Sequence, residues 1–204
     1  MKHALLFLVG LTATLALHAQ TPTSAPALPP EVSTREILTW QSLAPLPDPE
    51  GFAGSYAGIS GGALLVAGGA NFPDRRPWEG GTKVWHAPIF VLETPTGTWK
   101  TAGSLPRPAG YGLSLTLPEG VLLIGGGDAT THFSEVHLAR WDGKTVTLES
   151  RPALPVGLSQ HTGALVGRTV YVAVGLERPD SPQARNTVLT FNLESIGKET
   201  LADR

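Results

Sequence analysis

Three copies of one pattern constrain the fold of this chain more than any other feature of its sequence. Each copy opens with Leu-Pro, at Leu46, Leu105 and Leu154. A run of small and alternating apolar residues follows, then a glycine-containing turn and a second apolar run. The second runs end at Gly68, Gly125 and Val174. The leucine-to-leucine separations are 59 and 49 residues, and such self-similarity indicates a repeat architecture.

The residues after each pair of runs also repeat. A third strand is expected over residues 88–93, 135–141 and 187–193, and a fourth around Trp99 and after Trp141. Units of about 50 residues with four strands each are typical of the kelch class of β-propeller blades. We therefore predict an all-β, kelch-type propeller with units near 36–104, 105–153 and 154–204. A β-sandwich with glycine-rich hairpins is the alternative, but it does not predict three copies in register.

The number of units predicts an incomplete ring. Glu36–Trp40 precedes the first Leu-Pro as the segment around Trp99 precedes the second, which indicates an outer strand of the closing blade. About three blades and one such strand do not close a ring, because propellers have about 4–8 blades. Either further blades belong to this protein or several copies assemble, and self-association through open blade edges is expected.

The N-terminal residues predict export. Residues 1–19 combine a short basic head, an apolar run and a small residue, Ala19, which is typical of a cleaved signal peptide. A membrane anchor is the alternative, but the run of about 14 residues is shorter than the ~20 that span a bilayer. Residues 20–35 are a Pro/Ser/Thr-rich linker. We expect a periplasmic protein with no stable membrane insertion after cleavage.

Composition excludes several classes of function. The formal net charge is −2 and no basic stripe is present, which argues against nucleic-acid binding. The chain has no cysteine, which excludes disulfides and thiolate metal ligands. No two histidines share one element at metal-ligand spacing, so we expect no bound metal.

The longest loop, Gly68–His86, contains the best candidates for ligand binding. Loops that leave the second strands gather over the propeller axis, and this loop carries tryptophans together with Arg75, Arg76, Glu79 and Lys83. Aromatic faces and cations suit a small-molecule sugar acid. The alternative is a solvated lid or a loop bridging two blades, whose tryptophans only pack.

Two further segments face the same axis. The loop into the second unit carries Arg107 and Tyr111, where Arg107 is suited either to a carboxylate ligand or to the carbonyl groups of a neighbouring blade. The third unit has His161 at a similar place, where a lone histidine is more often a packing residue. Asp128 and His132 are weaker candidates.

The run GGANFP…WEGGTKVWH…IFVLE…TW, followed by GSLPRPAGYGLSLT…GVLLIGG, resembles the N-acetylneuraminate epimerases, in particular a cyclically permuted branch of that family. The resemblance covers nearly all of residues 36–193. It implies a periplasmic ring of six blades, within the range of about 4–8, that interconverts the α and β anomers of N-acetylneuraminate. It also implies acid–base opening of the sugar ring without a cofactor.

The family's proposed catalytic glutamate and arginine lie in a motif of the form GExKPGxR, which this sequence lacks. A partial match to the motif lies in a different blade, where Gly175 is followed by Glu177, Arg178 and Arg185. We therefore assign no catalytic residue. Two hypotheses remain open at this point: a sialic acid mutarotase, or part of one, and a non-catalytic carbohydrate-binding or interaction propeller.

Overall fold

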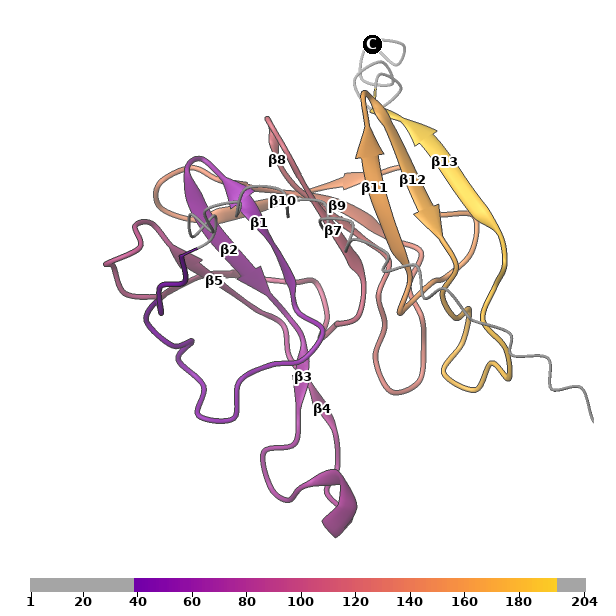
Figure 1. The fold of residues 1–204 in the computed structure, drawn as a ribbon, viewed down its shortest axis with the longest axis horizontal. Coiled ribbons are helices and arrows are strands. Elements are labelled where there is room, and N and C mark those ends of the chain that lie inside the picture. Colours follow the sequence, from indigo (N-terminus) through magenta and orange to yellow (C-terminus); the bar gives the residue numbers. More distant parts are fainter. Residues whose placement is uncertain (1–38, 194–204) are drawn as a thin grey trace, which may run out of the picture. The chain divides into compact units, whose positions relative to one another are not determined.

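The computed structural model describes residues 39–193, and this part of the chain consists of antiparallel β-sheets (Figure 1). The first sheet has the order β1 (Tyr56–Ser60), β2 (Ala63–Ala67), β5 (Pro88–Leu92), β6 (Lys100–Ser104). The second contains β7 (Leu113–Leu117), β8 (Gly120–Ile124), β9 (Val136–Trp141) and β10 (Val146–Arg151). The third contains β11 (Thr162–Val166), β12 (Thr169–Ala173) and β13 (Val188–Asn192).

The long loop of the first unit forms a small hairpin of its own. Its strands are β3 (Ala70–Asn71) and β4 (Val84–Trp85), and a 3-10 helix, η1 (Pro77–Glu79), lies between them. In the described residues no helix is long and apolar enough to cross a membrane.

These strands confirm the all-β prediction and the position of each predicted third strand. The first two units are four-stranded sheets, whereas the third has three strands in the described residues. The predicted outer strand at 36–40 falls mostly outside those residues, and Thr39 and Trp40 are not in a strand. The predicted signal peptide and linker, residues 1–35, also lie outside them.

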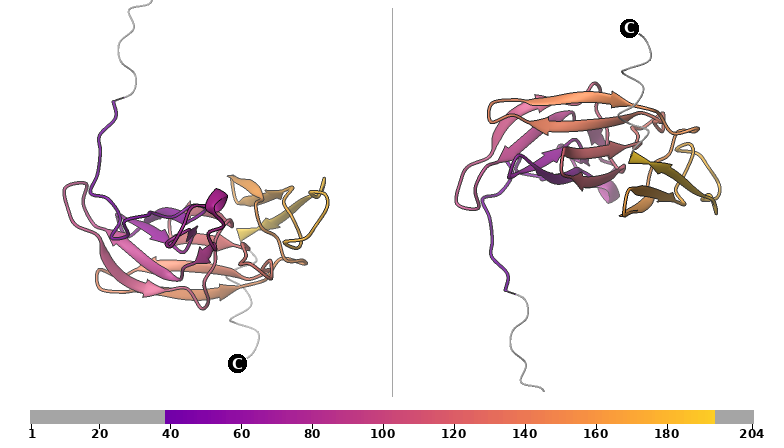
Figure 2. Two further views of the ribbon diagram at one scale, coloured as in Figure 1. Left: turned by 90° about the horizontal axis from the view of Figure 1, so that it is seen from below. Right: turned by 90° about the horizontal axis from the view of Figure 1, so that it is seen from above.

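Alternation along the strands places apolar side chains on both faces of the second sheet. Val121, Leu123 and Ala139 belong to one buried cluster with residues of the first sheet such as Ile89 and Val91. Leu122, Ile124 and Leu138 belong to another with Val170 and Val172 of the third. All five residues of β8 are buried, since its two faces pack against different sheets. Figure 2 shows the strands from two further directions.

Glycines at the ends of the second strands allow the sheets to approach closely. Gly68 has φ of +61°, and a Cβ there would lie 2.3 Å from the carbonyl oxygen of Ala109 in the next unit. Gly125 has φ of +57°, and its Cβ would lie 2.6 Å from the carbonyl oxygen of Leu158. Both positions need a left-handed backbone and have no room for a side chain. Crowding between neighbouring units thus explains the glycines at these two strand ends.

Candidate functional site

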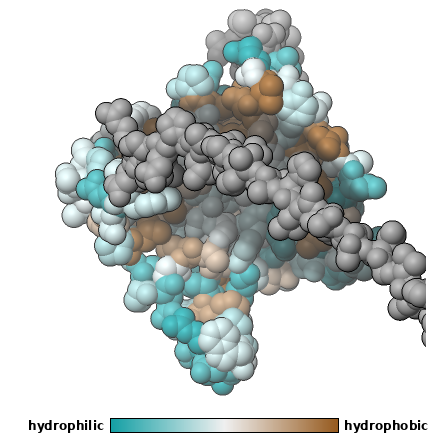
Figure 3. All heavy atoms as spheres, viewed as in Figure 1, coloured by the Kyte–Doolittle hydropathy of each residue, from teal (hydrophilic) through white to brown (hydrophobic). Residues whose placement is uncertain are grey.

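The β3–β4 hairpin borders a cavity of about 470 Å³, which we call the hairpin cavity. Three of the predicted ligand-binding residues line it: Arg76, Lys83 and Tyr111. Aromatic and amide side chains complete much of its wall: Phe52, Asn71, Phe72 and Trp78. Figure 3 shows that the tip of the hairpin is mainly hydrophilic. The structure therefore brings together cations and aromatic faces, as the sequence predicts for this loop.

The tip of the hairpin is held by hydrogen bonds of its own. The Glu79 carboxylate accepts a hydrogen bond from the Arg76 backbone N–H at 3.1 Å, and Gly80 ends η1 in the left-handed conformation. The Arg76 guanidinium donates to the Glu50 carboxylate at 2.6 Å. Glu79 therefore caps the start of η1 and does not pair with Lys83.

Lys83 is held by aromatic rings rather than by a carboxylate. Its ammonium nitrogen lies 4.1 Å from the centroid of the Tyr111 ring and 5.1 Å from that of Trp85. Among residues 39–193 it has no ion-pair partner. Cation–π attraction positions an ammonium group without neutralising its charge. Lys83 therefore presents a full positive charge at the hairpin cavity.

The backbone of Tyr111 fixes the ring that holds Lys83. Tyr111 has φ of 60°, and Gly54 and Gln160 occupy the same place before the first strand of their units, with φ of 67° and 55°. The Tyr111 N–H donates to the Gly54 carbonyl at 2.7 Å, and the Gln160 N–H donates to the Tyr111 carbonyl at 2.7 Å. A Cβ on Gly54 would lie 2.6 Å from the Tyr111 ring. The glycine of the first unit thus makes room for the tyrosine of the second.

Asn71 lines the hairpin cavity, and the sequence analysis did not predict it as a site residue. It is buried, its Nδ2 donates to the Asp48 carboxylate at 3.2 Å and to the Gly51 carbonyl at 3.0 Å, and its Oδ1 lies 2.7 Å from Nε2 of His86. These bonds join β3, and the residue that follows β4, to the loop before β1. The available sequence signal was a polar residue close behind the glycine pair, in Gly68-Gly69-Ala70-Asn71.

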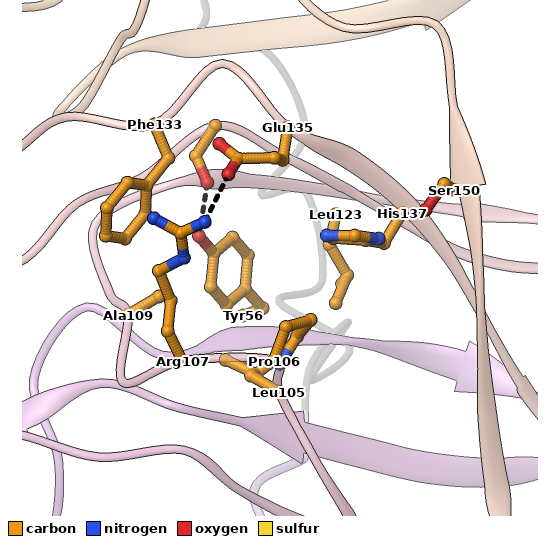
Figure 4. A pocket seen from close by; sticks show the side chains of 11 residues that line it. Tyr56, Leu105, Pro106, Arg107, Ala109, Leu123, Phe133, Glu135, His137 and Ser150 are labelled. Carbon is orange, nitrogen blue, oxygen red and sulfur yellow. Dashed lines mark hydrogen bonds and ion pairs between the residues drawn. The ribbon is translucent and has the colours of Figure 1, made fainter.

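Arg107 lies at a different cavity, of about 280 Å³, which we call the inter-sheet cavity (Figure 4). Its guanidinium donates to the Glu135 carboxylate at 2.8 Å and stacks 4.8 Å from the centroid of the Phe133 ring. Both charged side chains are about half exposed. Arg107 therefore already has a carboxylate partner from within the chain.

Two titratable groups inside the inter-sheet cavity are shifted toward their neutral forms. Burial, and secondarily the charge of Glu135, raises the pKa of Tyr56, whose hydroxyl donates to the Gly125 carbonyl. Burial lowers the pKa of His137, while the charge of Glu135 opposes that shift. Glu135 and His137 were not predicted as site residues. The available signal was polar residues on both sides of Val136 at the start of an otherwise apolar strand.

The remaining predicted residues lie outside both cavities. Arg75 is exposed and pairs with Asp74 at 3.5 Å. His161 is buried, its two ring nitrogens have no hydrogen-bond partner in the described structure, and burial lowers its pKa. Arg185 pairs with Glu177, the glutamate of the partial motif. No group of three possible metal-ligating side chains occurs within residues 39–193.

Comparison with known proteins identifies the family. A family model described as N-acetylneuraminate epimerase matches residues 30–148, which is more than half of the chain. This chain belongs to the N-acetylneuraminate epimerase family. The matched residues include the β3–β4 hairpin, Lys83, Arg107, Tyr111 and Glu135. The hairpin cavity therefore lies wholly within the family region, and the inter-sheet cavity does so except for Ser150.

Individual relatives cover the same part of the chain. It is 37% identical over 133 residues to the N-acetylneuraminate epimerase of Pasteurella multocida and 38% identical over 123 residues to that of Vibrio cholerae. These alignments cover 56% and 52% of this chain but 35% and 32% of the two relatives. The solved structure of YjhT matches with a TM-score of 0.50 and 32% identity, over 54% of this chain and 34% of that one. The chain thus spans about a third of the length of these relatives.

Proposed function

We propose that this chain forms the part of a sialic acid mutarotase that binds the carboxylate of the sugar. The substrate is N-acetylneuraminate, and the reaction interconverts its α and β anomers. In this proposal the three sheets are blades of a six-bladed, kelch-type ring that is exported to the periplasm, and six lies within the range of about 4–8 blades found in propellers.

The observation that carries the proposal is the placement of Lys83. Its ammonium group stands at the hairpin cavity over the Tyr111 and Trp85 rings, with no carboxylate partner in the described residues. A sugar acid supplies the missing anion, and its C–H surfaces suit the aromatic walls. Arg76 is the second cation of the cavity, although Glu50 already neutralises it.

The reaction needs a proton donor and acceptor near the sugar ring. A base removes the proton of the anomeric hydroxyl, the bond from C2 to the ring oxygen breaks, and that oxygen takes up a proton. Reclosure on the other face of the planar C2 gives the other anomer. No redox step occurs, so no cofactor is required. Lys83 contributes by orienting the carboxylate on C1 during these steps.

A non-catalytic sugar-binding role is the second candidate, and one observation favours it. Glu50 lines the hairpin cavity, and its carboxylate is paired with Arg76. The Glu79 carboxylate caps η1. Neither is free to act as the base while these contacts persist. On this alternative the chain binds the sugar acid without accelerating exchange of its anomers.

Binding and anomer exchange of N-acetylneuraminate, both followed by NMR, test the two candidates. Lys83→Ala should weaken binding about ten- to a hundredfold, the effect of losing one charge-assisted hydrogen bond of ~1.5–3 kcal/mol. Lys100→Ala is the matched control, because Lys100 pairs with Glu93 outside the cavity. Equal binding by both variants would refute the proposed role of Lys83. Binding without faster exchange would favour the non-catalytic candidate.

A further inference from the structure

The inter-sheet cavity has the features of a second ligand site, separate from the hairpin cavity. The residues that line the two cavities do not overlap. Its volume of about 280 Å³ lies just below the ~300–1,000 Å³ typical of small-molecule sites, which limits an occupant to roughly one small ring. Nothing in the sugar-acid proposal uses this space.

The walls of the cavity divide into an apolar and a polar side. Leu105, Pro106 and Ala109, from the connection between the first two sheets, form the apolar side. Glu135, His137 and Ser150, from the second sheet, supply the polar groups. In Figure 4 the His137 ring points toward the space between Glu135, Tyr56 and Pro106. A ligand with hydroxyl groups on one side and C–H groups on the other matches this division.

The charges of the cavity cancel within the chain. Arg107 and Glu135 pair at 2.8 Å, and the guanidinium is further held against the Phe133 ring. A carboxylate ligand would have to displace Glu135 from Arg107 and would be repelled by it. A hydroxyl group meets no such obstacle, since the guanidinium has unused N–H donors and the Glu135 carboxylate has unused lone pairs.

His137 adds a neutral donor and acceptor. Its burial lowers its pKa, so the imidazole is uncharged near neutral pH and carries one N–H and one acceptor nitrogen. Its Nδ1 is buried without a hydrogen-bond partner in the described structure, so Nε2 is the ring nitrogen that is left to meet a ligand. A neutral imidazole gives no attraction for anions but forms hydrogen bonds with hydroxyl groups.

We propose that the inter-sheet cavity binds a neutral, polyhydroxylated ligand of monosaccharide size, and that the Arg107–Glu135 pair makes it select against sugar acids. The two cavities then distinguish sugar acids from neutral sugars by charge. The hairpin cavity offers an uncompensated cation, whereas the inter-sheet cavity offers a compensated pair.

The NMR resonance of the His137 imidazole reports occupancy of this cavity and not of the hairpin cavity. It is assigned as the resonance that is lost in His137→Phe. We expect galactose or glucose to shift it in a saturable manner, and galacturonate, a sugar acid of the same ring size, to leave it unchanged at the same concentration. Arg107→Met should abolish the shift by galactose and glucose. Lys83→Ala, which alters only the hairpin cavity, should leave it intact, so failure of this proposal is distinguishable from failure of the sugar-acid proposal.

Glu135→Gln tests the selectivity. It keeps the shape of the side chain but leaves Arg107 uncompensated, so the sugar acid should now shift the His137 resonance with at least about a tenfold gain in affinity. The wild-type titrations stand even if this variant fails to fold. The proposal is overturned if neither neutral sugar shifts the resonance, or if the sugar acid shifts it in the wild type more strongly than they do.

Discussion

The ammonium nitrogen of Lys83 lies 4.1 Å from the centroid of the Tyr111 ring, although the two residues belong to different repeat units. Lys83 comes from the hairpin of the first unit and Tyr111 from the connection into the second. Tyr111 reaches this position because its left-handed backbone and the absence of a side chain on Gly54 direct its ring there. The positive charge at the cavity therefore depends on how two neighbouring units meet.

Substitution of Tyr111 should separate the role of its ring from that of its hydroxyl. Tyr111→Phe keeps the aromatic face, so sugar-acid binding should be nearly unchanged. Tyr111→Leu removes that face and should weaken binding by roughly two- to fivefold, since an exposed cation–π contact contributes ~0.5–1 kcal/mol. Titration of both variants by NMR provides the comparison, and equal losses in the two would exclude the cation–π explanation.

Gly68→Ala should destabilise the fold far more than an alanine at a matched glycine. Gly68 and Gly167 have nearly the same φ, +61° and +60°, but only Gly68 has a neighbour within 4 Å of its Cβ position. Both substitutions incur the cost of a left-handed alanine, about 1–2 kcal/mol. Gly68→Ala adds overpacking against the Ala109 carbonyl, about 1–3 kcal/mol more. Urea denaturation of both variants measures the difference, and equal losses would mean that crowding between units is unimportant.

The strands were predictable because their signals are local. Alternating apolar residues and glycine turns define the strand pairs of each unit, and the glycines at 68 and 125 mark the crowded strand ends. The spacing of the repeats then predicted four strands per unit, as the first two sheets have. Val174 occupies the third of these strand ends with φ of 57°, and the pattern gave no reason for a β-branched residue there.

The contacts of the candidate site were less predictable, because they join segments that are distant in sequence. The residue types of the long loop indicated a site for a sugar acid, but not that Lys83 would lie over Tyr111 while Glu79 caps a helical turn. Arg107 was expected to face the same ligand. Its partner, Glu135, directly precedes β9 of the second sheet, and only the packing of the connection against that sheet brings them together.

Acidification should destabilise the chain through its buried histidines. Burial lowers the pKa of His161 below its unfolded value of about 6.5, so below that pH the unfolded state binds a proton that the folded state resists. This contribution to stability is complete above about pH 6.5 and is lost as the pH falls through the lower, folded pKa. The temperature of thermal unfolding should fall as the pH is lowered from about 7.5 to 5. It should fall less steeply with pH in His161→Leu.

Burial also lowers the pKa of His137. The double variant His161→Leu/His137→Phe should therefore show the smallest dependence of the unfolding temperature on pH. Carboxylates such as Glu149, with lowered pKa values, lose their contribution at more acidic pH and do not interfere in this window. An unchanged slope in the double variant would show that these imidazoles do not govern the acid response.

The outer face of the third sheet should make residues 36–204 self-associate when they are produced alone. Val166, Tyr171 and Val188 are 63%, 40% and 58% exposed, and in the described structure β13 pairs on one side only. An exposed apolar face beside an unpaired strand edge favours aggregation. Size-exclusion chromatography should show oligomers or poor recovery, and Tyr171→Lys with Val188→Lys should reduce both. Val84→Lys, at an exposed apolar residue of the separate β3–β4 hairpin, is the control and should have no such effect. A compact monomer that unfolds cooperatively without these substitutions would contradict the prediction, because it would mean that the open face is stable in water.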